Sequence, residues 1–170
     1  MSHPSENIRA AIRQALVDKL KTKVDDVFPT DAGEKVYGSR AKPLFDQFLP
    51  AILVYTRNEN IIEERFATDG YGASKRELEV AIEAVVLGNE QVDDSLDKIS
   101  KQIEDALDGF EMANRKADTL KLKSTDMDVS IDGSKIYGAA RLTYSVTYYT
   151  SNKEPDNSGT IPTEIEANFP

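Results

Sequence analysis

The sequence predicts an α+β protein in which two α-helices pack on one face of a mixed, mainly antiparallel β-sheet, forming an α/β sandwich. Three observations predict this class. Residues 75–86 alternate between apolar and mostly acidic side chains, as in a strand with one buried and one solvated face. Residues 8–21 and 92–110 instead repeat their apolar side chains at helical spacing. The other elements are apolar or Tyr/Thr-rich strands, in the order helix, two or three strands, helix, two strands.

The N-terminal part holds the first helix and two strands. The helical stripe consists of Ile8, Ile12, Ala15, Leu16 and Leu20. Ser2 or Ser5 is expected to cap this helix, and the pattern breaks at residues 28–33. A short strand is predicted over 35–39, whereas 40–48 is ambiguous because Pro43 limits any regular element. Residues 51–56 form an apolar strand directly after a proline.

A polar connection is predicted over residues 57–73, with glycines near its end. Ile61 and Ile62 form an apolar island within it, so an extension of the preceding strand is the alternative. Because loops of this length in compact domains are usually functional or disordered, we expect it to be ordered only in an assembly. The strand over 75–86 follows, with its apolar residues directed into the core.

The C-terminal part begins with a helix over 92–110. Its apolar stripe is Val92, Leu96, Ile99, Ile103, Leu107 and Phe110. Asp93 and Asp94 favour the helix start and Gly109 its end. Strands are predicted over 120–131 and 136–150, joined by a turn at Asp132 and Gly133.

Residues 151–170 contain three prolines and few apolar side chains, which predicts a mobile tail or arm. The expected organisation is therefore one domain over 1–150 with a C-terminal extension over 151–170.

Composition excludes several classes of protein. The formal net charge of −9 argues against a nucleic-acid reader, which usually presents a basic face. The basic side chains that cluster, interpreted as solvated surface, are Lys19, Lys21, Lys23, Arg115 and Lys116. The absence of cysteine excludes disulfides and thiolate metal sites. No apolar run reaches the roughly 18 residues that a membrane span needs, and the N-terminus lacks an apolar signal core, so a cytosolic protein, or one released by cell lysis, is expected.

Residues for catalysis are sparse, and no cofactor is expected. The single histidine, His3, lies near the N-terminus, which argues against a histidine triad or zinc site. Residues 70–72 precede a strand rather than a helix, so they do not form a phosphate-binding loop. Asp93, Asp94 and Asp97 suggest a magnesium site, but capping and solvation of the helix explain them better. The sequence therefore predicts neither a metal site nor an enzyme.

The acidic face of the strand over 75–86 has two interpretations. Glu77, Glu79 and Glu83 share that face with Ala81 and Val85. Neighbouring like charges on a strand repel, so the face meets either bulk solvent or a channel or partner subunit. Tyr144, Tyr148 and Tyr149 near the last strand end are interpreted as packing or interface residues.

Several segments, taken in order, resemble a known family. They span residues 8–12, 49–55, 77–83, 93–97 and 140–148. The most specific are the first and the last strand among them, which read Leu-Pro-Ala-Ile-Leu-Val-Tyr and Ala-Arg-Leu-Thr-Tyr-Ser-Val-Thr-Tyr. Together they resemble the tail terminator family of tailed bacteriophages, which includes minor tail protein U of phage lambda. The resemblance covers about residues 6–150, with a longer 21–48 region and an extra 151–170 segment.

This resemblance implies a structural virion protein at the head-proximal end of the tail, made in the host cytoplasm. Family members form a ring of six subunits that caps the tail tube, stops its polymerisation and presents a surface to the head. The implied partners are further copies of the chain, the major tail tube protein and a head-completion or connector protein. DNA passes through the lumen without specific binding, and no membrane is involved.

The resemblance carries over no catalytic residue. The expected subunit or tube contacts are Ile61, Ile62, Phe66, Tyr71, Tyr148 and Tyr149, and Glu77, Glu79 and Glu83 are candidates for the lumen lining. The alternatives are another head–tail connector or tail-completion protein of similar fold and, less favoured, an acidic-site metal-dependent enzyme.

Overall fold

The computed structural model describes residues 7–39, 45–66, 72–112, 117 and 119–152. Its strands are β1 (Val36–Gly38), β2 (Ala51–Phe66), β3 (Gly72–Gly88), β4 (Thr119–Asp132) and β5 (Lys135–Asn152). They form one sheet in the order β1-β2-β3-β5-β4. Only β1 and β2 are parallel, and every other neighbouring pair is antiparallel. The predicted mixed, mainly antiparallel sheet is confirmed.

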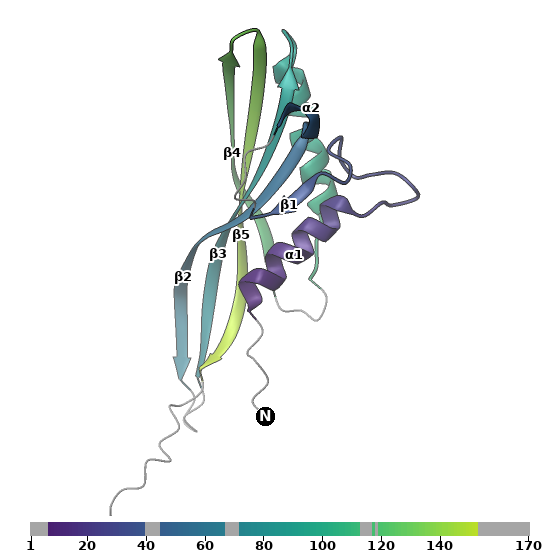
Figure 1. Ribbon diagram of the computed structural model, residues 1–170. Coiled ribbons are helices and arrows are strands. Elements are labelled where there is room, and N and C mark those ends of the chain that lie inside the picture. Colours follow the sequence, from purple (N-terminus) through teal and green to yellow (C-terminus); the bar gives the residue numbers. More distant parts are fainter. Residues whose placement is uncertain (1–6, 40–44, 67–71, 113–116, 118, 153–170) are drawn as a thin grey trace, which may run out of the picture.

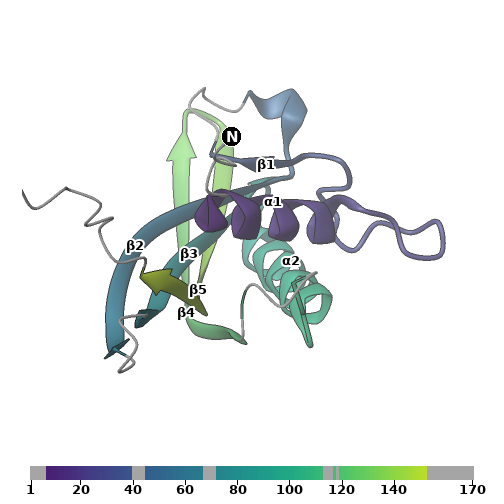
Figure 2. The ribbon, with the colours of Figure 1, turned by 90° about the horizontal axis from the view of Figure 1, so that it is seen from below.

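Two helices, α1 (Ile8–Lys21) and α2 (Val92–Leu107), cover one face of this sheet (Figures 1 and 2). The first packs on β1 and β2, and the second packs on β3 and β5. Apolar side chains from both helices and from the covered sheet face form a single core. The predicted α+β class is therefore confirmed. We call the uncovered side of the sheet the open face.

Both helices differ at one end from the expectation. Neither Ser2 nor Ser5 is among the described residues, and the cap of α1 is Asn7, whose Oδ1 accepts a hydrogen bond from the Ala10 N–H at 3.3 Å. The second helix stops at Leu107 rather than at residue 110. The chain turns away there because Gly109 adopts a φ of +63°.

The alternation predicted for β3 is confirmed, since its core-facing residues are buried. They are Leu78, Val80, Ile82, Ala84 and Val86. The start of α2 lies very close to the sheet at Gly138 of β5. A Cβ atom there would lie 2.7 Å from Val92 Cγ2, so only glycine permits this approach.

The predicted polar connection over 57–73 is wrong, and the alternative, an extension of the preceding strand, is confirmed. Residues 57–66 continue β2, which pairs with β3 from Ala51 opposite Val85 to Phe66 opposite Gly72. Irregularities between Thr56 and Glu59 and after Ile61 shift the register. Because each shift changes which side chains share a face, they remove the period-two signal from the sequence. Residues 67–71 lie outside the described residues.

The remaining elements agree with those predicted from the sequence. The short strand over 35–39 appears as β1, and the strand after Pro50 is β2, preceded by the short helix η1 (Asp46–Phe48) and a cis Leu49–Pro50 bond. The β4–β5 hairpin turns at Gly133, with φ at +61°. Strand β5 ends at Asn152. Residues 153–170, which follow it, lie outside the described residues.

Candidate functional site

The sheet extends past the start of α1 as a three-stranded arm (Figure 1). We define the arm as residues 59–66 of β2 with the segments of β3 and β5 that pair beside them, 72–78 and 146–152. The central strand, β3, holds the arm together by pairing with both neighbours. The outer edge of β2 along the arm has no strand neighbour among the described residues, because β1 pairs only with Ile52–Val54.

Glu59 anchors the base of the arm. Its carboxylate accepts hydrogen bonds from the Tyr148 hydroxyl and from Arg76 Nη1 at 2.5 Å, and Arg9 of α1 lies 3.8 Å away. Burial raises the pKa of Glu59, but the hydrogen bonds from Tyr148 and Arg76 outweigh it and hold the pKa below its usual range. Burial also raises the pKa of Tyr148 to about 12. The Glu59 carboxylate of β2 thus contacts side chains from α1, β3 and β5.

The interface candidates separate into exposed and buried residues. Ile61, Ile62 and Tyr149 are 52%, 49% and 47% exposed, which is unusual for large side chains in strands. Tyr148 is only 3% exposed and belongs to the core. The side chain of Phe66 and all of Tyr71 lie outside the described part of the chain. The arm therefore presents an apolar pair, Ile61 and Ile62, near its free edge.

The glutamates that we considered for a lumen lie together on the open face of β3. Glu79 is half-buried, like the other two. Glu83 accepts hydrogen bonds from Arg141 Nε at 2.8 Å and Nη2 at 2.5 Å. Glu77 accepts one from Ser145 Oγ at 2.5 Å and lies 3.7 Å from Lys123 Nζ, and the Ser145 hydrogen bond lowers its pKa. Basic side chains thus neutralise part of this acidic face.

The edge strand β4 carries exposed apolar residues that were not among the predicted interface candidates. They are Leu122, Met127, Val129 and Ile131, between 39% and 73% exposed, and we call them the β4 stripe. Met127 and Val129 lie opposite Ala140 and Gly138 of β5, on the helix side of the sheet. All of residues 121–131 are exposed. The alternation of these apolar residues with aspartates over 126–132 was the available signal.

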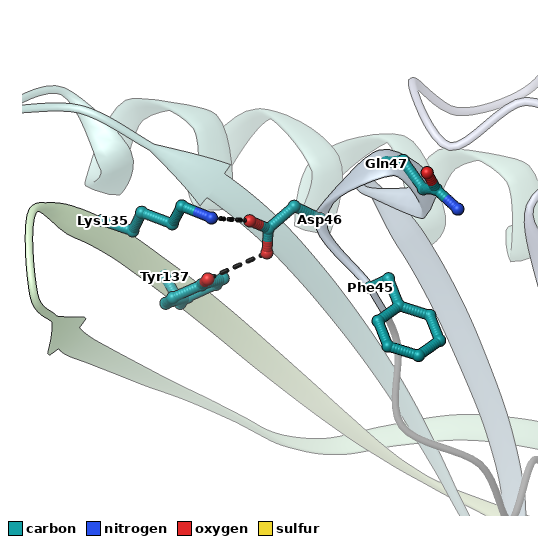
Figure 3. A pocket seen from close by; sticks show the side chains of 5 residues that line it. All are labelled: Phe45, Asp46, Gln47, Lys135 and Tyr137. Carbon is teal, nitrogen blue, oxygen red and sulfur yellow. Dashed lines mark hydrogen bonds and ion pairs between the residues drawn. The ribbon is translucent and has the colours of Figure 1, made fainter.

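A hollow of ≈ 650 Å³ lies between η1 and the start of β5 (Figure 3). Phe45, Asp46, Gln47, Lys135 and Tyr137 line it. Asp46 accepts hydrogen bonds from Lys135 and from the Tyr137 hydroxyl at 2.8 Å, and the Lys135 contact is the main reason why its pKa is lowered. These groups satisfy one another, which anchors η1 to the sheet rather than presenting a nucleophile and base to a substrate.

Among the described residues, no three histidine, cysteine, aspartate or glutamate side chains lie close enough together to hold a metal ion. Asp93 and Asp94 lie in the first turn of α2, where carboxylates favour the helix dipole. None of the helices described is long and apolar enough to cross a membrane.

The chain is similar to known proteins both in sequence and in fold. The sequence model of a family described as phage minor tail protein U matches residues 7–148. A search of curated proteins found no significant match. Among solved structures, a chain described as "Virion of native gene transfer agent (GTA) particle" has the same fold, with a TM-score of 0.57 and 12% identity. The alignment covers 86% of this chain and 100% of that one.

Proposed function

Because the chain belongs to the phage minor tail protein U family, a family of structural proteins of the virion tail, we propose that it caps the finished tail tube as a ring of six subunits. In this role it stops tube polymerisation at the head-proximal end and provides the surface to which the head attaches. Its partners are the major tail tube protein and a head-completion or connector protein, met in the host cytoplasm during assembly. The observation that carries the proposal is the family match over nearly the whole described chain.

The geometry supports an assembly role in a second way. The arm and the β4 stripe expose large apolar side chains at the two opposite edges of one sheet. Such exposed apolar groups in a small domain indicate surfaces that another protein covers.

We further propose that the open face with Glu77, Glu79 and Glu83 lines the passage for DNA. Acidic residues outnumber basic ones 30 to 21 in the whole chain, so its mean field repels a duplex. Because Arg141 and Lys123 pair with two of these glutamates, the lining is weakly rather than strongly acidic.

Removing the gene from its phage tests the capping role. Without a cap, tubes should grow past their normal length, and electron microscopy should show overlong tails without heads. Tails of normal length that fail to join heads would instead identify a connector or tail-completion protein. Normal particles would contradict any role at this junction.

A further inference from the structure

We propose that neighbouring copies of this chain join head to tail through the two edges of the sheet, with β4 of one copy antiparallel to residues 57–64 of β2 in the next. This inference rests on the proposed ring and names the surfaces that build it. The occupant of each free edge is therefore a second copy of the same chain.

The backbone is the first reason. In the described residues, β4 has a sheet neighbour on one side only, and the outer edge of β2 is unpaired beyond Val54. Free N–H and C=O groups along a strand edge bind another strand readily. A contact between two different edges of the same chain is heterologous, and repeating it closes a ring when the rotation permits.

The charges set the direction of pairing. Lys121 and Lys123 occupy the first half of β4, and Asp126 and Asp128 occupy the second. On β2 the order of signs is also basic then acidic, because Arg57 precedes residues 63–64, which are both glutamates. Antiparallel pairing places glutamates opposite lysines and Arg57 opposite aspartates. Parallel pairing would oppose like charges throughout.

One register satisfies the charges, and at the Glu63 end of β2 it also matches the faces of the strands. Glu63 lies opposite Lys75 of β3, and Lys121 lies opposite Ser145 of β5, so both belong to the open face. Setting Glu63 opposite Lys121 of the neighbour brings Arg57 between Asp126 and Asp128. Ile62 then comes to the level of Leu122, so one exposed isoleucine of the arm meets the first residue of the β4 stripe.

The charges of β4 also permit two copies of this strand to pair with each other, with Lys121 opposite Asp128. That isologous contact stops at two copies and leaves Ile61 and Ile62 uncovered. Its symmetry axis would also fall beside Ser124, at the irregularity of β4, where backbone pairing is disrupted. The head-to-tail contact covers the two isoleucines and can repeat around a ring, although it also spans the irregularities of β2 and β4. The experiments below distinguish the two.

Charge reversal without a change of net charge is the first test. One variant reverses β2 (Arg57→Glu/Glu63→Lys), and another reverses β4 (Lys121→Glu/Lys123→Glu/Asp126→Lys/Asp128→Lys). Each alone should lose assembly on tail tubes, whereas an equal mixture should regain it, because each variant then meets its complement at both edges. Circular dichroism checks that each variant is folded. Normal assembly of the β4 variant alone is expected for the isologous contact and would overturn the proposal.

Disulfide trapping is the second test and does not depend on charge. The chain has no cysteine, so any cross-link comes from introduced residues. A mixture of Ile62→Cys and Leu122→Cys chains should give a mixed disulfide dimer on mild oxidation, in excess over either homodimer. A predominant Leu122→Cys homodimer, or no cross-link, would overturn the head-to-tail edge contact. If six-subunit caps still form without the cross-link, only this interface fails; if no caps form, the proposed function fails too.

Discussion

At the residue scale, Glu59 is the side chain on which the arm depends most. Replacing it by glutamine weakens its bonds with Tyr148 and Arg76, so Glu59→Gln should lower the free energy of unfolding by about 1–3 kcal/mol at neutral pH. The folded-state pKa of Glu59 lies below its ordinary value of 4.5. Its stabilising effect is therefore present above that value and lost as pH falls through the folded-state pKa.

Urea unfolding of both proteins at about pH 7 and about pH 3 measures this change. The difference between native and variant chains should shrink at the lower pH. A difference that stays constant would show that the carboxylate charge contributes nothing.

Gly138 provides a second prediction at this scale. Gly138→Ala places a methyl group 2.7 Å from Val92 Cγ2 and 2.9 Å from Leu96 Cδ1, so α2 must shift. We expect a loss of about 1–3 kcal/mol in thermal or urea unfolding. Gly38→Ala is the matched control, because its nearest contact, Val17 Cγ2 at 3.5 Å, is an ordinary distance. Equal effects of the two substitutions would refute the close approach of helix and sheet.

At the element scale, the arm should behave as a surface element. Ile61 is 52% exposed, so Ile61→Asp should change the free energy of unfolding by about 1 kcal/mol or less while weakening assembly. Ile82, in the same sheet but fully buried, is the contrast: Ile82→Asp should prevent folding. If Ile61→Asp unfolds the isolated chain, the residue belongs to the core and the arm is misassigned.

The open face permits a matched pair of variants. Glu83→Lys sets a cation beside Arg141 and Arg57, which should destabilise the domain by about 1 kcal/mol. Adding Arg141→Glu restores an ion pair and should recover part of this loss. In a reconstituted particle, Glu77→Lys/Glu79→Lys/Glu83→Lys should hinder DNA passage, whereas unchanged passage would place this face outside the lumen.

A strand could be predicted from the sequence where one of its faces packs against other parts of the same chain. It was harder to predict where that face is exposed. The alternation of apolar and acidic side chains in β3 could be recognised because the helices bury one face of this strand. The continuation of β2 was not, because two register shifts break its period and the arm exposes large side chains such as Ile61. The β4 stripe was not predicted as an interface for a related reason. Nothing in the described residues covers it, so its apolar groups do not appear as part of a core.

At the scale of the whole molecule, charge and exposed apolar surface oppose each other. Each subunit carries a formal net charge of −9, so copies repel one another at low ionic strength. The arm and the β4 stripe supply the attraction. Free rings should therefore become more abundant as salt and protein concentration rise, which light scattering measures. Assembly that weakens as salt rises would mean that the ion pairs between β2 and β4 outweigh the repulsion between the net charges of the subunits.

The mass of the assembly formed with tail tubes shows whether the chain caps the tube as a ring of six. A chain of 18.9 kDa that caps a tube as a closed ring should be released from purified tails as a complex of six copies, measured by native mass spectrometry. The same species should appear in the free protein at high concentration and salt. A strict monomer under all these conditions, including in the presence of tail tubes, would contradict the account.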